Sequence, residues 1–495
     1  MIPENIEIHR NGKTYFCNIS LSPFHLFRHN GTVYLLNVTA MTSAVIDNRM
    51  SRILDHIRFN KGLPVPSAVM EELENMGLVN GSGAKENILS HPPGKNRPGM
   101  DDLIKKLMEE PVATLSMNIT QQCNLNCVYC YGNTGECGSE GRMDETTATR
   151  AVDWLMAQSG EKKSVGILFG GGEPLMNFSL IRHVVAYADK RARALGKKVR
   201  YGMTTNATLL DHEKIAFLET HGIVPLVSFD GPEHIHNENR PFKNGRGSYG
   251  TVAKNVEKLL QKIPGARCRA TIRRAKDLPQ IKKAILKAGF TSYTLTPAVP
   301  SLYGNWTPRD RGAEVKRHMC DFLNNEADIT FDAIRDRTVP KHGFKLLLGY
   351  LYALLSKRKR LYGCGAGRGY LGVSVKGDLF PCPLFTGDPE MKMGSVFGTD
   401  ADREPYLRAM VTRLERCARC WAAHFCGGGC IYTNKAANGD PFKPVEAYCD
   451  RVKYAIEKAV SIFHRLDGSD MDFLKEKQQQ IRGINTSHDG KQFHH

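Results

Sequence analysis

Three cysteines stand close together in the run CNLNCVYC, where Cys123, Cys127 and Cys130 have the spacing CX3CX2C. Three thiolates on one short loop can each bind one iron of a cubane [4Fe–4S] cluster, which leaves the fourth iron without a protein ligand. A substrate or cofactor can bind that open iron. A zinc site and a disulfide loop are the alternatives, but zinc usually needs a fourth ligand, and no Cys or His stands at such spacing here. The spacing therefore favours a cluster that does chemistry.

This loop resembles that of the radical S-adenosylmethionine (SAM) superfamily, which has the same cysteine spacing. The resemblance implies that the open iron binds the amino and carboxylate groups of SAM. It further implies that the reduced cluster cleaves SAM to a 5′-deoxyadenosyl radical, which takes a hydrogen atom from an unactivated carbon. The protein would bind, orient and shield the cofactor.

A glycine motif follows one strand after the loop. Residues 164–169 are predicted to form a buried strand, which ends in the run GGGEPL. Glycines allow close approach of a ligand, and a glutamate or a freed carbonyl can accept a hydrogen bond from an ammonium. The run resembles the GGE element of the family, which implies that Gly171, Gly172 and Glu173 bind SAM. Taken alone, a triple glycine could also be an ordinary strand-to-helix turn.

Strands and helices alternate through about six units, which predicts an α/β fold with a parallel sheet. The predicted strands span 113–120, 164–169, 198–204, 223–229, 268–273 and 290–295. Ligands of such sheets lie at the carboxyl ends of the strands, where each motif falls. The resemblance implies a partial (β/α)6 barrel in which Ser228 and Asp230 lie near the SAM ribose, Asn206 lines the same mouth and Tyr129 packs near the adenine. A cap or turn role is the alternative for each.

Seven cysteines in the last third have the spacing CX12GX4C, CX2CX5CX3C and CX18C. This series resembles the SPASM domain of radical SAM peptide maturases, which carries two auxiliary [4Fe–4S] clusters. The resemblance implies that the first cluster is bound by Cys364, Cys382 and Cys430, and the second by Cys417, Cys420, Cys426 and Cys449. Three clusters in total are expected, and a fourth ligand of the first auxiliary cluster stays open. A zinc ribbon is the alternative.

A separate unit precedes the barrel. It has predicted strands at 6–10, 14–20 and 32–38 and helices at 41–57 and 67–76. This order resembles the winged-helix peptide-recognition element of ribosomal-peptide maturases, in which a leader peptide adds as a strand to a sheet edge. A capping domain without a ligand and a nucleic-acid-binding winged helix are the alternatives.

The rest of the chain completes the domain prediction. The predicted domains are a winged-helix-like recognition unit (1–80), a linker (81–108), the partial barrel (109–300), a helical bridge (301–360), the SPASM domain (361–466) and a polar, mobile tail (467–495). The first residues lack the basic and apolar pattern of a signal peptide, which favours a cytoplasmic enzyme with reduced thiols. The formal net charge of +17 is spread along the chain, so it gives little support for a nucleic-acid partner.

These features together predict a radical SAM enzyme that modifies a ribosomally synthesised precursor peptide, with a thioether crosslink as the first expectation and a carbon–carbon crosslink close behind. A formylglycine-forming maturase of the sulfatase type and a nucleic-acid-modifying enzyme are the alternatives. A zinc or electron-transfer protein is the non-enzyme alternative. The expected partners are the peptide and a reductant such as ferredoxin or flavodoxin, with no membrane. Arg269 and Arg273 could pair with the SAM carboxylate or the peptide, and no catalytic base is assigned.

Overall fold

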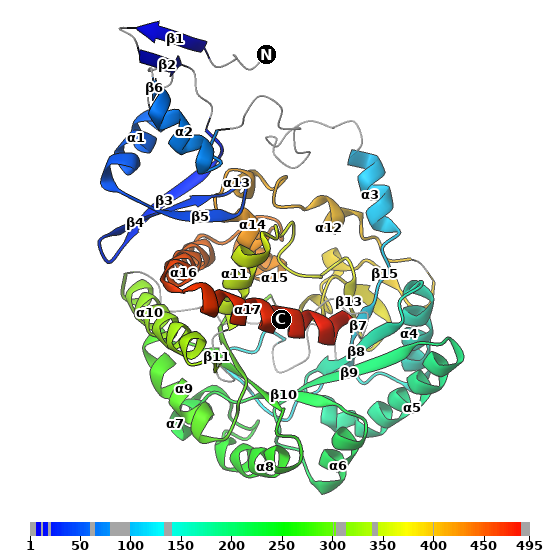
Figure 1. Cartoon of the computed structure of the whole chain (residues 1–495). Coiled ribbons are helices and arrows are strands. Elements are labelled where there is room, and N and C mark those ends of the chain that lie inside the picture. The colour runs from blue at the N-terminus through cyan, green and yellow to red at the C-terminus, as the bar shows by residue number, and fades with distance from the viewer. Residues whose placement is uncertain are drawn as a thin grey trace.

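The computed structural model describes residues 6–10, 13–17, 21–59, 65–79, 100–132, 141–299, 301–302, 313–338, 345–398 and 400–486. Most of the expected linker and the unassigned Cys137 lie outside these residues. Figure 1 shows a twisted sheet surrounded by helices, with the N-terminal unit on the far side of a group of C-terminal helices.

The central sheet confirms the predicted parallel α/β core. Six parallel strands follow one another in chain order, and neighbours along the chain are neighbours in the sheet. They are β7 (Thr114–Thr120), β8 (Ser164–Gly171), β9 (Lys198–Thr205), β10 (Val224–Ser228), β11 (Arg267–Ile272) and β12 (Tyr293–Pro297). Because parallel strands end at one edge of a sheet, the motifs that follow β7, β8, β9 and β10 meet there.

Helices cover one face of these strands, as Figure 1 shows. They are α4 (Glu145–Gln158), α5 (Phe178–Ala194), α6 (His212–Thr220), α7 (Glu233–Asn239), α8 (Tyr249–Lys262) and α9 (Leu278–Lys287). Asp144 caps α4, because its carboxylate accepts a hydrogen bond from Thr147 N at 2.7 Å. Along β7, Leu115 and Met117 are fully buried in the apolar core, while the alternating Ser116 and Asn118 face the other way. The inner face of the sheet is therefore polar.

The cysteine-rich region extends the same sheet. Strand β13 (Tyr370–Val373) pairs in parallel with β7, and β14 (Asp378–Phe380) and β15 (Gly394–Ser395) continue the sheet in antiparallel order. This pairing lies between segments about 250 residues apart in the chain, which the sequence pattern did not reveal. It fixes the cysteines that flank β13 and β14 against the barrel strands.

The N-terminal unit has three strands more than predicted, β3, β5 and β6. One sheet contains β1 (Ile6–Arg10), β2 (Lys13–Cys17) and β6 (Val65–Pro66), and the other contains β3 (Phe24–His29), β4 (Thr32–Asn37) and β5 (Thr42–Ile46). Helices α1 (Asn48–Phe59) and α2 (Ser67–Asn75) follow. The helix expected from residue 41 is wrong at its start. Met41 has a left-handed φ of 56°, and Asp47 caps α1 by accepting from Met50 N at 2.6 Å.

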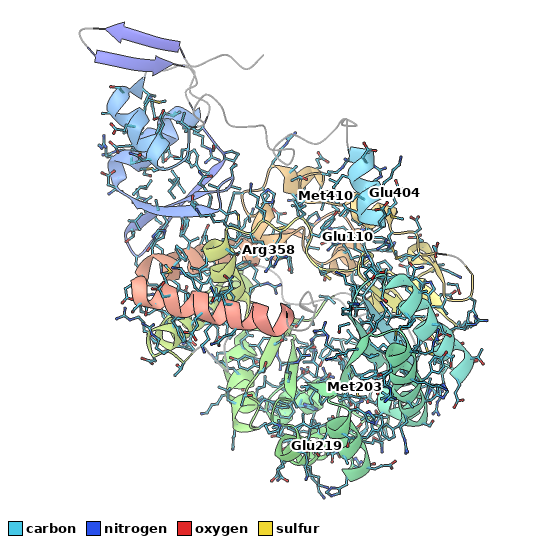
Figure 2. The ribbon with its side chains drawn as sticks, turned by 45° about the vertical axis from the view of Figure 1, so that its right-hand side comes forward. Glu110, Met203, Glu219, Arg358, Glu404 and Met410 are labelled. Carbon is cyan, nitrogen blue, oxygen red and sulfur yellow. The ribbon has the colours of Figure 1, made fainter. Side chains whose placement is uncertain are left out.

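Parts of the segments expected as linker and tail are helical. Residues 100–108 form helix α3 (Met100–Met108), whose Ile104 packs with Leu407 and Met410 of the cysteine-rich region, and Figure 2 shows Met410 beside this helix. The expected mobile tail forms helix α17 (Gly468–Thr486) instead. Both segments are mostly polar, but their few apolar residues fall on one helical face, so burial of that face orders them.

Four long helices form a second core beside the N-terminal unit. They are α10 (Ala313–Arg335), α11 (Lys345–Ser356), α16 (Glu446–Arg465) and α17. Shorter helices of the cysteine-rich region are α12 (Glu404–Arg408), α13 (Glu415–Ala418), α14 (Ala423–Cys426) and α15 (Ile431–Asn438). Within the described part of the chain, no helix combines the length and the apolar run that a bilayer crossing needs.

The packing of α17 can be tested with Leu474, which is fully buried in the second core. Replacing Leu474 with Ala should lower the free energy of unfolding by about 2–4 kcal/mol, because it leaves a cavity. Urea unfolding measures this change. Lys475→Ala is the matched control, because the Lys475 side chain is exposed. Equal stability of the two variants would show that α17 is not packed.

Candidate active site

The CX3CX2C loop begins three residues after the end of β7. Two hydrogen bonds join the loop to the end of α7 and the residues just after it. Asn126 N donates to Pro241 O at 2.8 Å, and Val128 N donates to Asn239 O at 3.0 Å. Its three cysteines are free thiols that remain partly exposed. The three sulfur atoms thus lie on one short loop that follows the carboxyl end of β7.

The sulfur atoms of this loop have cationic and amide neighbours. Arg240 Nη1 lies 3.8 Å from Cys127 Sγ, and Asn206 Nδ2 lies 3.8 Å from Cys123 Sγ. Burial is the main cause that raises the pKa of Cys127 to about 12, and the charge of Arg240 opposes that rise. Hydrogen bonds to cysteine sulfur stabilise a thiolate and influence the potential of an iron–sulfur cluster. Arg240 was missed by the sequence analysis.

Asp230 is fully buried and takes its hydrogen bonds from this chain. Its oxygens accept from the Tyr129 hydroxyl, from Asn239 Nδ2 at 3.1 Å and from Thr271 N at 3.0 Å, and Arg240 Nε lies 3.2 Å away. The carboxylate is thus engaged by groups of this chain, and its position near a SAM ribose stays a prediction. Its contact with Arg240 positions the guanidinium that reaches the cysteine loop.

Tyr129 also faces inward, since it is buried and its hydroxyl donates to Asp230. The Arg240 guanidinium lies 5.3 Å from the centre of its ring, in a cation–π arrangement. Tyr129 thus completes the buried group formed by Asp230 and Arg240. The structure does not test whether its other edge packs against an adenine, which stays a prediction.

Glu173 is fully buried as well, and it joins the glycine motif to the next strand. Its carboxylate accepts from Thr205 Oγ1 at 2.8 Å, Asn206 N at 2.7 Å and Leu175 N at 3.2 Å. Burial raises its pKa to about 7, while these three hydrogen bonds oppose the rise. Three protein donors thus engage the Glu173 carboxylate, and binding of an ammonium by the glutamate or by a freed carbonyl stays a prediction.

The glycines pass directly beneath the cysteine loop. A Cβ on Gly171 would collide with the carbonyl oxygen of Thr120, and one on Gly172 with that of Gln122. Gly171 also has a φ of 112°, which other residues rarely adopt. These two positions therefore require glycine because of the close approach between the two motifs.

The remaining predicted residues differ in their surroundings. Asn206 is buried, and its side chain donates to Asn124 Oδ1 at 2.9 Å, so it braces the loop. Ser228 is partly exposed at the carboxyl end of β10 and stays a candidate for ligand contact. Arg273 donates to Glu238 Oε1 at 2.9 Å near the surface, which corrects its suggested pairing with a ligand carboxylate.

The cysteines of the last third come together in two groups. Cys364, Cys382 and Cys430 influence one another electrostatically, which defines a group of three. The group of four consists of Cys417, Cys420, Cys426 and Cys449, which influence one another in the same way. Burial first, and then the neighbouring thiols, raise the pKa of Cys417 to about 12. The arrangement matches the two ligand sets that the resemblance implied, which remain proposals.

Glycines bring the two halves of the group of three together. A Cβ on Gly363 would collide with the carbonyl oxygen of Gly429, and one on Gly427 with that of Tyr362. Gly427 ends α14 in the left-handed conformation, with a φ of 78°. The loop that carries Cys364 can therefore lie directly against the loop that leads to Cys430.

The donor sets fit clusters better than single ions. Among the residues described, no three His, Cys, Asp or Glu side chains converge tightly enough to surround one metal ion. The thiolates of a cubane cluster bind separate iron atoms at its corners, so they stand farther apart than the ligands of one zinc ion. Ten free cysteines in groups of three, three and four therefore favour iron–sulfur clusters over zinc.

Comparisons with known proteins agree with this geometry. Residues 117–272 match the family described as the Radical SAM superfamily. An uncharacterised protein of Methanocaldococcus jannaschii is 36% identical over 28% of this chain and 46% of its own length, so this chain spans less than half of that relative. A cysteine-type anaerobic sulfatase-maturating enzyme of Clostridium perfringens is 22% identical over 72% of this chain and 99% of its own length.

A solved structure supports the same fold. The structure described as native anSMEcpe with bound AdoMet has a TM-score of 0.60 at 18% identity, and the match covers 71% of this chain and 98% of that one. At this identity the likeness establishes the fold. It agrees with the predicted α/β architecture built on a parallel sheet.

The buried ion pair can be tested with Arg240→Gln. This change should cost about 3–5 kcal/mol of stability, because it leaves the Asp230 carboxylate buried without its cation. It should also lower cluster occupancy after anaerobic reconstitution, as measured by visible absorption and iron content. Arg246→Gln is the control, since Arg246 is exposed in the same segment. Unchanged stability and iron content in Arg240→Gln would contradict this role.

His236 provides a pH test. It is fully buried, its Nδ1 accepts from Asp230 N at 3.3 Å, and burial lowers its pKa to about 4. The unfolded chain therefore binds the proton of His236 more tightly than the folded chain does. The stability that the neutral, buried His236 contributes is present above pH 6.5 and is lost as the pH falls toward 4. Between pH 7 and pH 5 the loss should be about 2 kcal/mol. Urea unfolding of His236→Gln should lack this component, and identical pH profiles would refute the assignment.

Proposed function

We propose that the chain is a radical SAM enzyme, and that it is a maturase that modifies a ribosomally synthesised peptide, because residues 117–272 match the Radical SAM superfamily and a sulfatase-maturating enzyme is similar over most of the chain. The observation that carries the proposal is the gathering of seven cysteines into a group of three and a group of four beside the three-cysteine loop. One cluster would serve SAM cleavage, and two more would lie along the path of a long substrate.

The domain implies SAM and one [4Fe–4S] cluster as cofactors, and we propose three clusters in total. When bound, SAM supplies a 5′-deoxyadenosyl radical that removes a hydrogen atom from the substrate. Cys123, Cys127 and Cys130 would hold the first cluster. Arg240 donates toward Cys127 Sγ, and Gly171 and the buried Glu173 place the backbone of the glycine run beneath the loop. The chain thus orients the cofactors and shields them from water.

The N-terminal unit supports a peptide substrate. His25 of strand β3 stacks on Trp421 with ring centres 3.8 Å apart and an angle of 6° between the planes, and Trp421 directly follows Cys420. The same histidine contacts Glu457 of α16 at 2.8 Å. In a three-stranded sheet, edge strands β3 and β5 offer backbone groups that a leader peptide can pair with. A leader bound there would lie close to the group of four cysteines.

A thioether crosslink is the reaction we propose first. A substrate thiolate could bind an open iron of the group of three, which has three cysteines rather than four. Formylglycine formation is the second candidate. It is favoured by the match to the sulfatase-maturating enzyme of Clostridium perfringens, which covers 99% of that enzyme but only 72% of this chain. A cytoplasmic location and a ferredoxin or flavodoxin as reductant belong to the same proposal.

Cys127→Ala tests the role of the loop. The reconstituted wild-type protein should carry on the order of twelve irons, and the variant should carry about four fewer, because one cubane is lost. The variant should form no 5′-deoxyadenosine after reduction with dithionite, as measured by liquid chromatography. Cys320→Ala is the control, since Cys320 lies outside the three cysteine groups. Undiminished 5′-deoxyadenosine from Cys127→Ala would refute the proposal.

Two charge-introducing variants test peptide recognition. Tyr34, Leu36 and Met41 are buried in the core of the C-terminal helices, so deleting the unit would unfold more than the unit itself. Exposed residues of the edge strands are better targets. Arg28→Glu in β3 or Val45→Glu in β5 should lower peptide turnover at least tenfold by disturbing the edge that binds the leader, while peptide-free SAM cleavage stays unchanged. Full peptide turnover in both variants would exclude this recognition mode.

A further inference from the structure

A run of four cations, KRKR at residues 357–360, follows the end of α11. No Asp or Glu stands between Asp336 and Asp378 in the sequence, so this run has no acidic neighbour along the chain. Its charge can be balanced only by groups that are distant in the sequence or by another molecule. We call residues 357–360 the basic segment.

The second half of the basic segment faces the cysteine-rich region. Arg360 N donates to His424 O at 2.8 Å, and the charge of Arg360 opposes the rise in pKa that burial gives Cys426. Burial is the main cause that lowers the pKa of His424, and the charge of Lys359 adds to that effect. Both cations are only partly exposed. Arg360 and Lys359 thus belong to the surroundings of the group of four.

The first half of the basic segment is open to solvent. Lys357 and Arg358 are exposed, and in the described part of the chain no ion pair and no side-chain hydrogen bond includes either of them. Lys357 has a left-handed φ of 51°, at the point where α11 ends. An exposed cation without an anion is common in proteins, so the position of these two residues in the fold decides whether they can serve a partner.

The basic segment lies next to the N-terminal unit. Helix α11, which the segment follows, shares one apolar core with Tyr34 and Leu36 of β4. Figure 2 shows Arg358 between the N-terminal unit and the barrel. At the other end of the segment, Cys364 of the group of three stands four residues after Arg360. The segment therefore joins the neighbourhood of the proposed recognition unit to that of the cysteine groups.

The edge strand β3 reaches the same region. His25 stacks on Trp421, and Trp421 stands three residues before His424, whose carbonyl oxygen accepts from the basic segment. A leader that pairs with β3 and a reactive residue near the cysteine groups are parts of one peptide. The stretch of that peptide between them would run past the basic segment.

We propose that the basic segment binds an acidic stretch of the substrate peptide through Lys357 and Arg358. This inference rests on the proposed function and narrows its substrate class to peptides with several Asp or Glu residues between the leader and the modified part. Neighbouring cations suit an extended chain of carboxylates, since each carboxylate meets a charge of opposite sign. An acidic redox protein and a nucleic acid carry the same sign of charge. The position of the segment between two parts of one peptide path favours the peptide.

The first experiment measures the preference for carboxylates. Equilibrium dialysis of the reconstituted, full-length protein compares two blocked octapeptides, one with Gly-Glu repeated four times and one with Gly-Gln repeated four times. At an ionic strength of about 0.01 M the wild type should bind the Glu peptide roughly fivefold or more tightly than the Gln peptide. At about 1 M this difference should vanish, because salt screens exposed charges.

The second experiment assigns the preference to the basic segment. The double variant Lys357→Gln/Arg358→Gln should lose most of it. Lys254→Gln/Lys262→Gln is the matched control, because it removes the same charge from exposed residues of α8, and it should keep the preference. The exchange Lys357→Arg/Arg358→Lys keeps the charge and should also keep the preference. Circular dichroism checks that each variant is folded, and Arg358→Gln alone replaces the first variant if that one does not fold.

The outcomes separate the possible partners. A loss of the Glu preference in the segment variant alone supports the proposal, whereas an unchanged preference, or an equal loss in the α8 control, overturns it. Thermophoresis with a recombinant flavodoxin and with oligodeoxythymidine covers the other partners. If the segment variant weakens the binding of one of these but not of the Glu peptide, the proposal also fails. Peptide binding needs neither SAM nor reduction, so the result is independent of the 5′-deoxyadenosine assay that tests the proposed function.

Discussion

The geometry of the site depends most on the buried ion pair between Asp230 and Arg240. Asp230 lies just past the end of β10, and Arg240 follows α7, so the pair joins two loops over a fully buried position. The Arg240 guanidinium also donates toward Cys127 Sγ, and the Tyr129 hydroxyl donates to the Asp230 carboxylate. A buried charge pair is tolerated only when its remaining hydrogen-bonding groups are satisfied. Here the additional donors come from Asn239 and from the backbone of β11.

This pair explains why several acidic residues at the strand ends do not face the open edge. Asp230 and Glu173 hold the backbone of the loops that approach a cofactor, so their carboxylates are structural supports for the binding groups. Ser228, at the carboxyl end of β10, is partly exposed, in contrast to the two buried carboxylates.

Two long-range packings join the three parts of the chain. Strand β13 pairs with β7, so the strands of the cysteine-rich region belong to the central sheet. The sheet of β3, β4 and β5 has two buried faces: Val33 and Leu35 pack on α1 and α2, and Tyr34 and Leu36 pack on the C-terminal helices. A peptide bound at the edge of this sheet would therefore be held by a platform that belongs to the same core as the group of four cysteines.

Cysteine spacing, the glycine run and strand–helix alternation could be read without a structure, because each depends on local order along the chain. They predicted the parallel α/β core, and they marked the ten cysteines that the structure gathers into three groups. Helix α17 and the start of α1 were missed, since their formation depends on packing partners and a capping residue rather than on composition.

The sequence by itself determined which residue types reach the open edge of the sheet, because strand order and motif spacing are written along the chain. Only the tertiary structure decided which of them are engaged within the chain. Asp230 and Glu173, which the resemblance placed near a cofactor, accept hydrogen bonds from donors distant in the sequence. The physical reason is that a hydrogen bond or an ion pair is formed by atoms that meet in space, and such meetings depend on how distant segments pack.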